Sequence, residues 1–331
     1  MKKVLCFYHF ECPDGIFAAW LINMLPDRDV FWTPYEWHKP ITSAFDLFDE
    51  IYFVDIAPDI PVLEKILSNL REGQKLWILD HHDSTLKEFA ASLALPGQGY
   101  VSQTVPYSLM SGDGIEKFWH SGKTLKGGEF HFHLDKDHSG AGLTYAHVLK
   151  NYEHDSKVKR IIDMVEDRDT WKFKLPNSRD FYYSNQQNLD LAIANPLILF
   201  EVIDKLYLEG DLELEIEKGK SVRIFCDAKI AQYAKTYQII EIDGMRIPLI
   251  NVHKDWGSDT CSHMVNSMEE FPRAAYFLFN QGDIYMGFRS RSKEFPVNDI
   301  AKKFGGGGHE AAAACHLTLE TFTNVLQGKY K

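Results

Sequence analysis

The chain has 331 residues, about twice the length of a typical domain, so its length favours two domains. Hydrophobic residues make up 45% and charged residues 25% of the sequence, which excludes an extensively disordered, collagenous or coiled-coil protein. The 36 lysines and arginines against 47 aspartates and glutamates give a net charge of −11, which argues against a protein that coats long nucleic acids.

The expected setting is the cytoplasm. The longest stretch without a charge, residues 89–112, contains two prolines and three glycines and cannot cross a bilayer as a helix. The apolar run after Lys2 and Lys3 is too short for a secretory signal. The five cysteines are dispersed and include no CxxC pair, which indicates a reducing compartment.

The first 80 residues predict a parallel sheet. Residues 3–10 form an apolar, strand-like run that meets a turn signal at 12–15 and then a helical pattern. Two further apolar runs, 50–54 and 75–79, end at acidic residues. Continuous apolar strands separated by helices are typical of a parallel sheet covered on both faces, where ligands bind beyond the carboxyl ends of the strands. We therefore expect the strand-end residues to meet in one crevice: His9, Asp55 and Asp80.

Further along the chain the pattern changes. Residues 96–133 contain seven glycines and are expected to be a long insertion or lid. Helical patterns follow at 142–152 and 158–169, and a second alternation of strands and helices begins near residue 236. The predicted domains are residues 1–200, a helical connector at 201–232, and residues 233–331.

The motif Asp80-His81-His82 ends a predicted buried strand. Two imidazoles and a carboxylate are costly in an apolar setting unless they are paired or bind a metal. Oxygen and imidazole ligands together suit a divalent ion such as Mn²⁺, and two ions ~3.5–4 Å apart can clamp an in-line attack on phosphorus. His131 and His133 could suggest zinc, but no cysteine lies at ligand spacing, so we expect packed or solvated histidines.

A run of four glycines, 305–308, precedes His309. One interpretation is a flexible turn. The other is that bare amides open a helix and cradle a phosphate, with His309 as a further donor. Arg289 and Arg291 would supply guanidinium groups suited to phosphate.

Taken together, these motifs resemble the DHH phosphoesterases that carry a C-terminal DHH-associated domain. The resemblance covers nearly the whole chain. It rests on the following segments in order: HFECPDG (9–15), VDIAP (54–58), Asp80-His81-His82, Ser139-Gly140-Ala141, the block 167–171, and IAKKFGGGGHEAAAA (300–314) preceded by FRSR. The implied fold is α/β, with an N-terminal parallel-sheet domain that has helices on both faces and a smaller C-terminal α/β domain.

The resemblance implies a role for each matching residue. The implied metal ligands, with Asp55 bridging two ions, are His9, Asp14, Asp55, His81 and Asp167. The implied catalytic residues are His82, facing the phosphate, and Asp80, orienting its neighbours. The implied substrate-binding residues are Arg289, Ser290, Gly307, Gly308 and His309.

Two positions leave alternatives open. The family's first motif usually has two aspartates separated by one residue. If Asp14 is the second, Cys12 stands in the place of the first; if Asp14 is the first, Ile16 stands in the place of the second. The first alignment is preferred because Gly15 then directly follows the aspartate, and either one weakens a metal site. Glu11 is an alternative ligand, although a solvated carboxylate is the preferred interpretation. Asp167 and Asp169 are two apart at a helix end, and Asp167 is preferred as the one that points into the crevice.

The leading hypothesis is a phosphoric ester hydrolase, a metal-dependent phosphodiesterase or exonuclease of the nanoRNase kind. Its expected partners are short single-stranded oligonucleotides or dinucleotides, and its expected cofactor is a pair of Mn²⁺ ions. A homodimer is left open. The alternatives are a pyrophosphatase-like hydrolase of small phosphoanhydrides or phosphomonoesters, and a nucleotide-binding protein whose catalytic centre has decayed.

Overall fold

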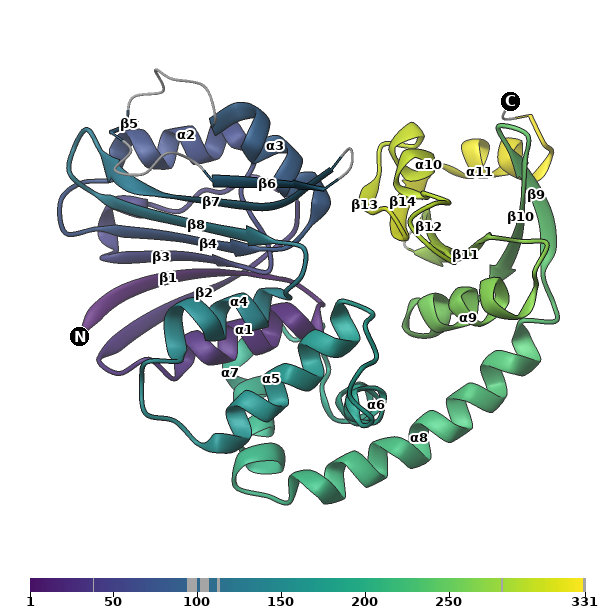
Figure 1. Ribbon diagram of the computed structural model, residues 1–331, viewed down its shortest axis with the longest axis horizontal. Helices are drawn as coiled ribbons and strands as arrows, with labels where there is room; N and C mark the ends of the chain where they lie inside the picture. The colour runs from purple at the N-terminus through teal and green to yellow at the C-terminus, as the bar shows by residue number, and fades with distance from the viewer. Residues whose placement is uncertain (38, 94–99, 102–106, 112–113, 281, 330–331) are drawn as a thin grey trace. The chain divides into compact units, whose positions relative to one another are not determined.

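The computed structural model describes residues 1–37, 39–93, 100–101, 107–111, 114–280 and 282–329 (Figure 1). The chain divides into two compact units, Met1–Arg223 and Ile224–Lys331. The division falls within helix α8, Leu212–Tyr233, which occupies part of the predicted connector. All five cysteines are free. Within the described ranges, no helix combines the length and the apolar composition that a membrane span requires.

The N-terminal unit is built on an eight-stranded sheet. Seven strands follow the order β2-β1-β3-β4-β8-β7-β5, and β6 also pairs with β7. Strands β2, β1, β3, β4 and β8 are mutually parallel, whereas β7 runs antiparallel to β8. The strand bounds are β1 Lys2–His9, β2 Arg28–Tyr35, β3 Glu50–Val54, β4 Lys75–Asp80, β5 Tyr100–Val101, β6 Tyr107–Ser111, β7 Gly114–Thr124 and β8 Glu129–Asp135.

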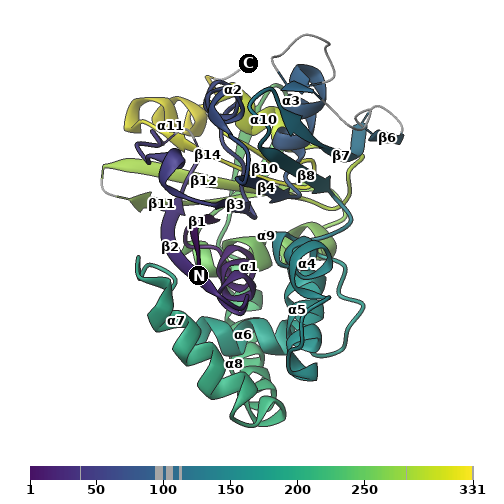
Figure 2. The same ribbon diagram turned by 90° about the vertical axis from the view of Figure 1, so that its left-hand side faces the viewer.

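Helices cover both faces of this sheet. Figure 1 shows α2 (Ile60–Asn69) and α3 (Asp83–Leu93) on one face, and α1 (Pro13–Asn23), α4 (Gly140–Thr144) and α5 (Ser156–Asp169) on the other. Figure 2 shows α1 and α4 side by side beneath the strands. Helices α6 (Ser178–Asn188) and α7 (Pro196–Ile203) complete the second layer. The predicted fold class, a parallel sheet between helices with a further α/β domain, is confirmed.

Strand β1 shows why the apolar runs are continuous. Cys6 and Tyr8 pack in the core on the α1 side, whereas Leu5 and Phe7 pack in the core on the α2 side, and all four are buried. A strand that is buried on both faces has no polar side to display, so its sequence does not alternate. At the edge of the sheet, β2 alternates over its first four residues between half-buried and exposed side chains.

Two features of the sheet differ from the expectation. Strand β2 is not among the predicted elements. It contains Pro34, which is unfavourable inside a sheet, but β2 lies at the edge, where a proline is tolerated. Residues 96–133 were expected to be an insertion or lid, yet β7 and β8 are long strands that extend the main sheet beyond β4. That expectation also covers parts of the chain that lie outside the described residues, namely 96–99, 102–106 and 112–113.

The C-terminal unit has a six-stranded sheet in the order β13-β14-β12-β11-β10-β9. The strands are β9 Gln238–Ile242, β10 Met245–Asn251, β11 Arg273–Asn280, β12 Asp283–Ser290, β13 Gly307–His309 and β14 Ala312–Leu317. Its helices are α9 Lys254–Ser267, α10 Asn298–Lys303 and α11 Leu319–Leu326. Apart from the parallel pair β10 and β11, neighbouring strands are antiparallel.

Candidate metal centre and anion-binding residues

The candidate metal centre lies at the switch point of the first sheet. Strand β1 sits between β2 and β3, so the chain leaves β1 and β3 in different directions and a crevice opens at their carboxyl ends. His9 is the last residue of β1, and Asp55 directly follows β3. Asp55 adopts a left-handed conformation with φ 58°, which costs a non-glycine residue energy and is common at functional sites.

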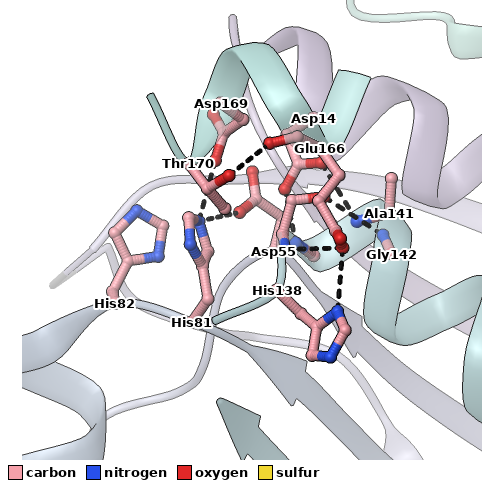
Figure 3. Close-up of polar contacts among 12 residues, drawn as sticks. Asp14, Asp55, His81, His82, His138, Ala141, Gly142, Glu166, Asp169 and Thr170 are labelled. Atoms are coloured by element: carbon pink, nitrogen blue, oxygen red, sulfur yellow. Dashed lines mark hydrogen bonds and ion pairs between the residues drawn. The ribbon is translucent and has the colours of Figure 1, made fainter. Parts of the chain in front are cut away.

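Asp55 is shared by two groups of potential metal donors. Asp14, Asp55 and His81 each offer a donor atom, and these atoms lie within 4.8 Å of one another. A second group with the same spacing consists of His9, Asp55 and His82. Asp55 Oδ2 is 3.3 Å from His9 Nδ1, and Oδ1 is 3.2 Å from His81 Nε2. The two oxygens of Asp55 therefore face two neighbouring donor sets, as the bridging role requires. Figure 3 shows Asp55 with Asp14 and His81 of the first set.

The centre carries an excess of carboxylates. Burial, together with the carboxylates of Asp55 and Asp169, raises the pKa of Asp14 well above its usual range. Burial also raises the pKa of Asp169, with Asp55 adding to the effect. Burial disfavours the charged form of His81, but Asp169 and Asp55 outweigh it and raise its pKa to about 10. Three carboxylates thus compete for few positive partners, which a bound cation would relieve.

The donor set fits a divalent ion. Asp55 Oδ1 is buried, and its close partner is His81 Nε2, at an ion-pair distance of 3.2 Å. Burial would raise the pKa of Asp55, but His81 and His9 lower it well below its usual range, so the carboxylate is ionised and can bind a cation. Oxygen and imidazole donors together suit Mn²⁺, Fe²⁺ or Zn²⁺. His9, Asp14, Asp55 and His81 are therefore brought together, as predicted from their strand-end positions.

Asp14 is held by the start of helix α4. The amide of Gly140 donates to Asp14 Oδ2 at 2.5 Å, and that of Ala141 donates to Oδ1 at 3.1 Å. Because Asp14 lies in the first turn of α1, these bonds tie two helices together at the crevice. A Cβ on Gly15 would lie 2.5 Å from the carbonyl oxygen of His9, so α1 can begin this close to β1 only with glycine there.

The preference for Asp167 over Asp169 is corrected by the structure. The carboxylate of Asp167 accepts hydrogen bonds from the amides of Lys174 and Leu175 at 2.7 and 3.1 Å, and from the Ser178 hydroxyl at 2.6 Å. It thus organises the loop after α5. Asp169 Oδ2 lies 3.4 Å from His81 Nε2, so Asp169 joins the centre. Two residues on a helix differ by about 200° in direction, so only one of them faces the crevice.

Asp80 and His82 support the centre from the end of β4. Asp80 Oδ1 accepts from the His81 amide at 2.8 Å and lies 2.7 Å from His82 Nδ1. Burial would favour the neutral acid, but His82 lowers the pKa of Asp80. Asp80 is therefore placed to orient both histidines.

Trp37 is a neighbour of the centre that the sequence reasoning missed. Its ring lies 4.7 Å from the His9 ring and 4.5 Å from the His82 ring, centroid to centroid. It follows β2 closely, so recognising Pro34 as an edge-strand proline would have brought Trp37 to the same end of the sheet.

Cys12 remains beside the donor groups. It occupies the N-cap position of α1, two residues before Asp14, without a capping hydrogen bond from its side chain. Burial and the carboxylates of Asp55 and Asp169 raise the pKa of its thiol well above the usual range. Within the described part of the chain, the three-membered donor groups contain neither Cys12 nor Glu11.

His131 and His133 lie on one face of β8, where the His133 ring stacks on His147 at 3.9 Å between centroids. Burial lowers the pKa of His133 to about 3. Stacked, half-buried rings match the expectation of packed histidines.

In the C-terminal unit, Arg289 and His309 lie on one face of the sheet. Both are directly opposite Ala312 on β14, and residues opposite one another in antiparallel strands share a face. Arg289 Nη2 donates to the Ser258 hydroxyl of α9 at 3.2 Å. Ser290 is the next residue on β12 and points to the other face, where its hydroxyl donates to the Ser292 carbonyl at 2.9 Å.

The glycine run does not open a helix. Gly305, with φ 74°, terminates α10, and the amide of Gly306 donates to the Ala301 carbonyl at 2.9 Å. Gly307 and Gly308 then enter β13, which pairs with β14. A Cβ on Gly308 would lie 2.6 Å from the Ala312 carbonyl oxygen, so close strand packing explains this glycine. The expected helix-opening phosphate cradle is therefore wrong.

Arg291, also expected to face phosphate, has a different role. Its guanidinium donates to the carbonyls of Val265 and Met268 at 2.7 and 2.9 Å, at the end of α9. It stabilises the carbonyl end of that helix.

Comparisons with known proteins agree with part of the resemblance. Residues 240–328 match the DHHA1 domain family, which confirms the resemblance over the C-terminal domain. A curated relative, the uncharacterized protein R106 of Acanthamoeba polyphaga mimivirus, is 24% identical over 189 residues, which cover 55% of this chain and 41% of that protein. The match thus spans less than half of the relative's length.

Three solved structures illustrate the range of similar proteins. The pGpG-specific phosphodiesterase PggH of Vibrio cholerae is 11% identical, with a TM-score of 0.47 over 100% of this chain and 98% of that one. An exopolyphosphatase-related protein of Bacteroides fragilis is 14% identical, with a TM-score of 0.49 over 98% and 92%. RecJ of Thermus thermophilus, in complex with Mn²⁺, is 13% identical, with a TM-score of 0.47 over 99% and 51%.

Proposed function

We propose that this chain, whose residues 240–328 are a DHHA1 domain, hydrolyses phosphodiester bonds of short oligonucleotides or dinucleotides with a divalent metal. The observation that carries the proposal is Asp55, a buried carboxylate shared by two donor groups, with one oxygen toward His9 and the other toward His81. A divalent ion bound there would lower the pKa of a water molecule and neutralise charge on a phosphate. Mn²⁺ is the proposed ion, and a pair of ions fits the two groups.

The residues of the N-terminal unit would have different roles. His9, Asp14, Asp55, His81 and Asp169 would hold the metal. Asp80 orients His81 through its amide and His82 through its ring, and His82 would contact the phosphate. Asp14 keeps its position through the amides of α4.

Arg289 and His309 would bind the rest of the substrate. They share one face of the second sheet, and a guanidinium suits bidentate contact with phosphate. Gly307 and Gly308 precede His309 on β13, so their backbone would lie beside the bound anion, whereas Ser290 points to the other face of the sheet. Short substrates agree with the net charge of −11, because each phosphate contact needs a basic partner.

The test is hydrolysis of pApA, a labelled pentanucleotide and pyrophosphate in the presence of Mn²⁺, with nucleotides separated by chromatography. We expect mononucleotides from the first two substrates. Asp55→Asn should abolish turnover, whereas Asp163→Asn, an exposed change on α5, should not. Turnover of pyrophosphate alone would favour the pyrophosphatase-like alternative.

One observation favours the impaired-centre alternative. Cys12 occupies the place of an aspartate in the first motif, and within the described part of the chain it does not belong to a donor group. Tight binding of pApA with at most one metal per chain and no cleavage would support that alternative and contradict hydrolysis.

A further inference from the structure

Glu166 is a carboxylate next to the proposed metal ligands that is not itself one of them. It lies three residues before Asp169 on α5, on the same side of the helix. Its Oε2 is 3.0 Å from His138 Nδ1 and accepts from the Ser139 amide at 3.2 Å. A Cβ on Gly142 would lie 1.7 Å from the same oxygen, so the carboxylate occupies space that only glycine leaves open (Figure 3).

The four amides at the start of α4 are all used. The Ser139 amide donates to Glu166, and those of Gly140 and Ala141 donate to the two oxygens of Asp14. The Gly142 amide donates to Ser139 Oγ at 3.1 Å, which already caps the helix. Glu166 is therefore not needed as the cap. Its bond instead anchors the turn to α5.

The position of this turn sets the position of the centre. Because the amides of Gly140 and Ala141 fix both oxygens of Asp14, a shift of the turn would shift Asp14. The same turn packs closely against Asp55, since a Cβ on Gly140 would lie 2.4 Å from the Asp55 Cβ. Asp169 belongs to the same helix as Glu166. Helix α5 therefore carries Asp169 itself and, through Glu166 and the turn, helps to position Asp14.

We infer that Glu166 is a positioning residue, which locks the turn 139–142 to α5 and thereby holds Asp14 and Asp169 at the separation that metal binding needs. The inference rests on the proposed function, because it takes Asp14 and Asp169 as metal ligands. Mutation of a group that orients a metal ligand without touching the metal typically lowers metal affinity about 10–100-fold.

The experiment measures Mn²⁺ binding by calorimetry on the full chain, with circular dichroism as the check of folding. Glu166→Ala should weaken binding about 10-fold or more. Glu166→Gln keeps an oxygen for the Ser139 amide, so its affinity should stay within about three-fold of the wild type. Asp163→Asn, one turn earlier on α5 in an exposed pair with Lys159, is the matched control and should not change affinity.

Gly142→Ala tests the same contact from the other side. Its new Cβ would displace the Glu166 carboxylate, so it should weaken Mn²⁺ binding as Glu166→Ala does. Added to Glu166→Ala, it should cause no further loss, because the displaced group is already absent. A merely structural role would lower stability in these variants but would leave their metal affinities equal to that of the wild type.

These measurements distinguish failure of the positioning role of Glu166 from failure of the proposed metal-dependent function. Wild-type protein that binds Mn²⁺, with folded Glu166→Ala and Gly142→Ala variants that bind it equally well, overturns the positioning role alone. Wild-type protein that binds no Mn²⁺ overturns the proposed function and the positioning role with it. If Glu166→Ala does not fold, the other two variants decide. Weaker Mn²⁺ binding by Gly142→Ala, with nearly wild-type binding by Glu166→Gln, supports the inference. Wild-type Mn²⁺ affinity in both variants contradicts it.

Discussion

Gly140 and Asp55 are in direct contact where helix α4 begins below the end of strand β3. A Cβ on Gly140 would lie 2.4 Å from the Asp55 Cβ and 2.6 Å from its Cα, far inside normal contact distance. Only a residue without a side chain at position 140 lets the start of α4 come this close to Asp55, whose backbone is left-handed. This contact brings the amides of α4 to Asp14 and places Asp14 beside Asp55.

Gly140→Ala should damage both stability and metal binding. The added methyl must push apart α4 and the Asp55 backbone, and such overpacking typically costs about 1–3 kcal/mol in free energy of unfolding. Urea unfolding and Mn²⁺ calorimetry would measure the two effects. Gly307→Ala is the steric control for stability, because nothing lies within 4 Å of its added Cβ. Equal stability of the two variants would show that the Gly140 contact is not tight.

Asp167→Asn and Asp169→Asn should have opposite consequences. Asp167 accepts three hydrogen bonds from the loop after α5, so its variant should lose about 1–3 kcal/mol of unfolding free energy. Asp169 faces His81 among other carboxylates, so its variant should fold normally but lose activity and metal affinity. Urea unfolding and metal titration of both variants would distinguish them. Loss of metal affinity only in Asp167→Asn would restore the original preference.

Glu50 should make stability depend on acid pH. Burial opposes its charge, but the Lys2 and Arg28 side chains at 2.6 and 3.2 Å outweigh it and lower the pKa of Glu50. A carboxyl with a folded-state pKa below its unfolded value, about 4.3, stabilises the fold above that value and loses this contribution as pH falls through the folded-state pKa.

The stability difference between wild type and Glu50→Gln should therefore be largest near neutral pH and shrink below about pH 4. Thermal or urea unfolding at several pH values would measure it. Glu217→Gln, in an exposed pair with Lys220, should show little difference at any pH. A constant Glu50→Gln effect from pH 7 to pH 3 would contradict this explanation.

Arg289→Lys should weaken nucleotide binding despite keeping the charge. Lysine lacks the planar fork of the guanidinium, so the bond to Ser258 and a bidentate contact with phosphate cannot both form. We expect the Kd for pApA to rise about 10-fold, which corresponds to the ~1.4 kcal/mol of one charge-assisted hydrogen bond. Calorimetry with pApA would measure it, with Arg246→Lys at an exposed position as control. Unchanged affinity would remove Arg289 from the binding site.

The strand-end residues were predictable because parallel strands present their carboxyl ends at one edge. His9, Asp55 and Asp80 each end a recognisable apolar run, and the structure brings them together with His81. Asp169 was harder to identify, since the choice between two residues in the last turn of α5 depends on how the helix is rotated. That rotation is fixed by tertiary bonds to Asp167.

The glycine run shows a different limit of the sequence. Glycines that precede a helix and glycines that allow strands to pack closely have the same composition. Only the pairing of β13 with β14 distinguishes them. Likewise, Glu166 looks like any charged residue of an amphipathic helix until its contact with Ser139 and Gly142 is seen.

The most direct measurement of the central claim is anomalous diffraction at the manganese edge from crystals soaked in Mn²⁺, for the wild type and for Asp55→Asn. We expect a wild-type peak at coordination distance from Asp55 and His81, and its loss in the variant. A crevice without a peak, or a peak that persists in Asp55→Asn with unchanged height, would contradict it.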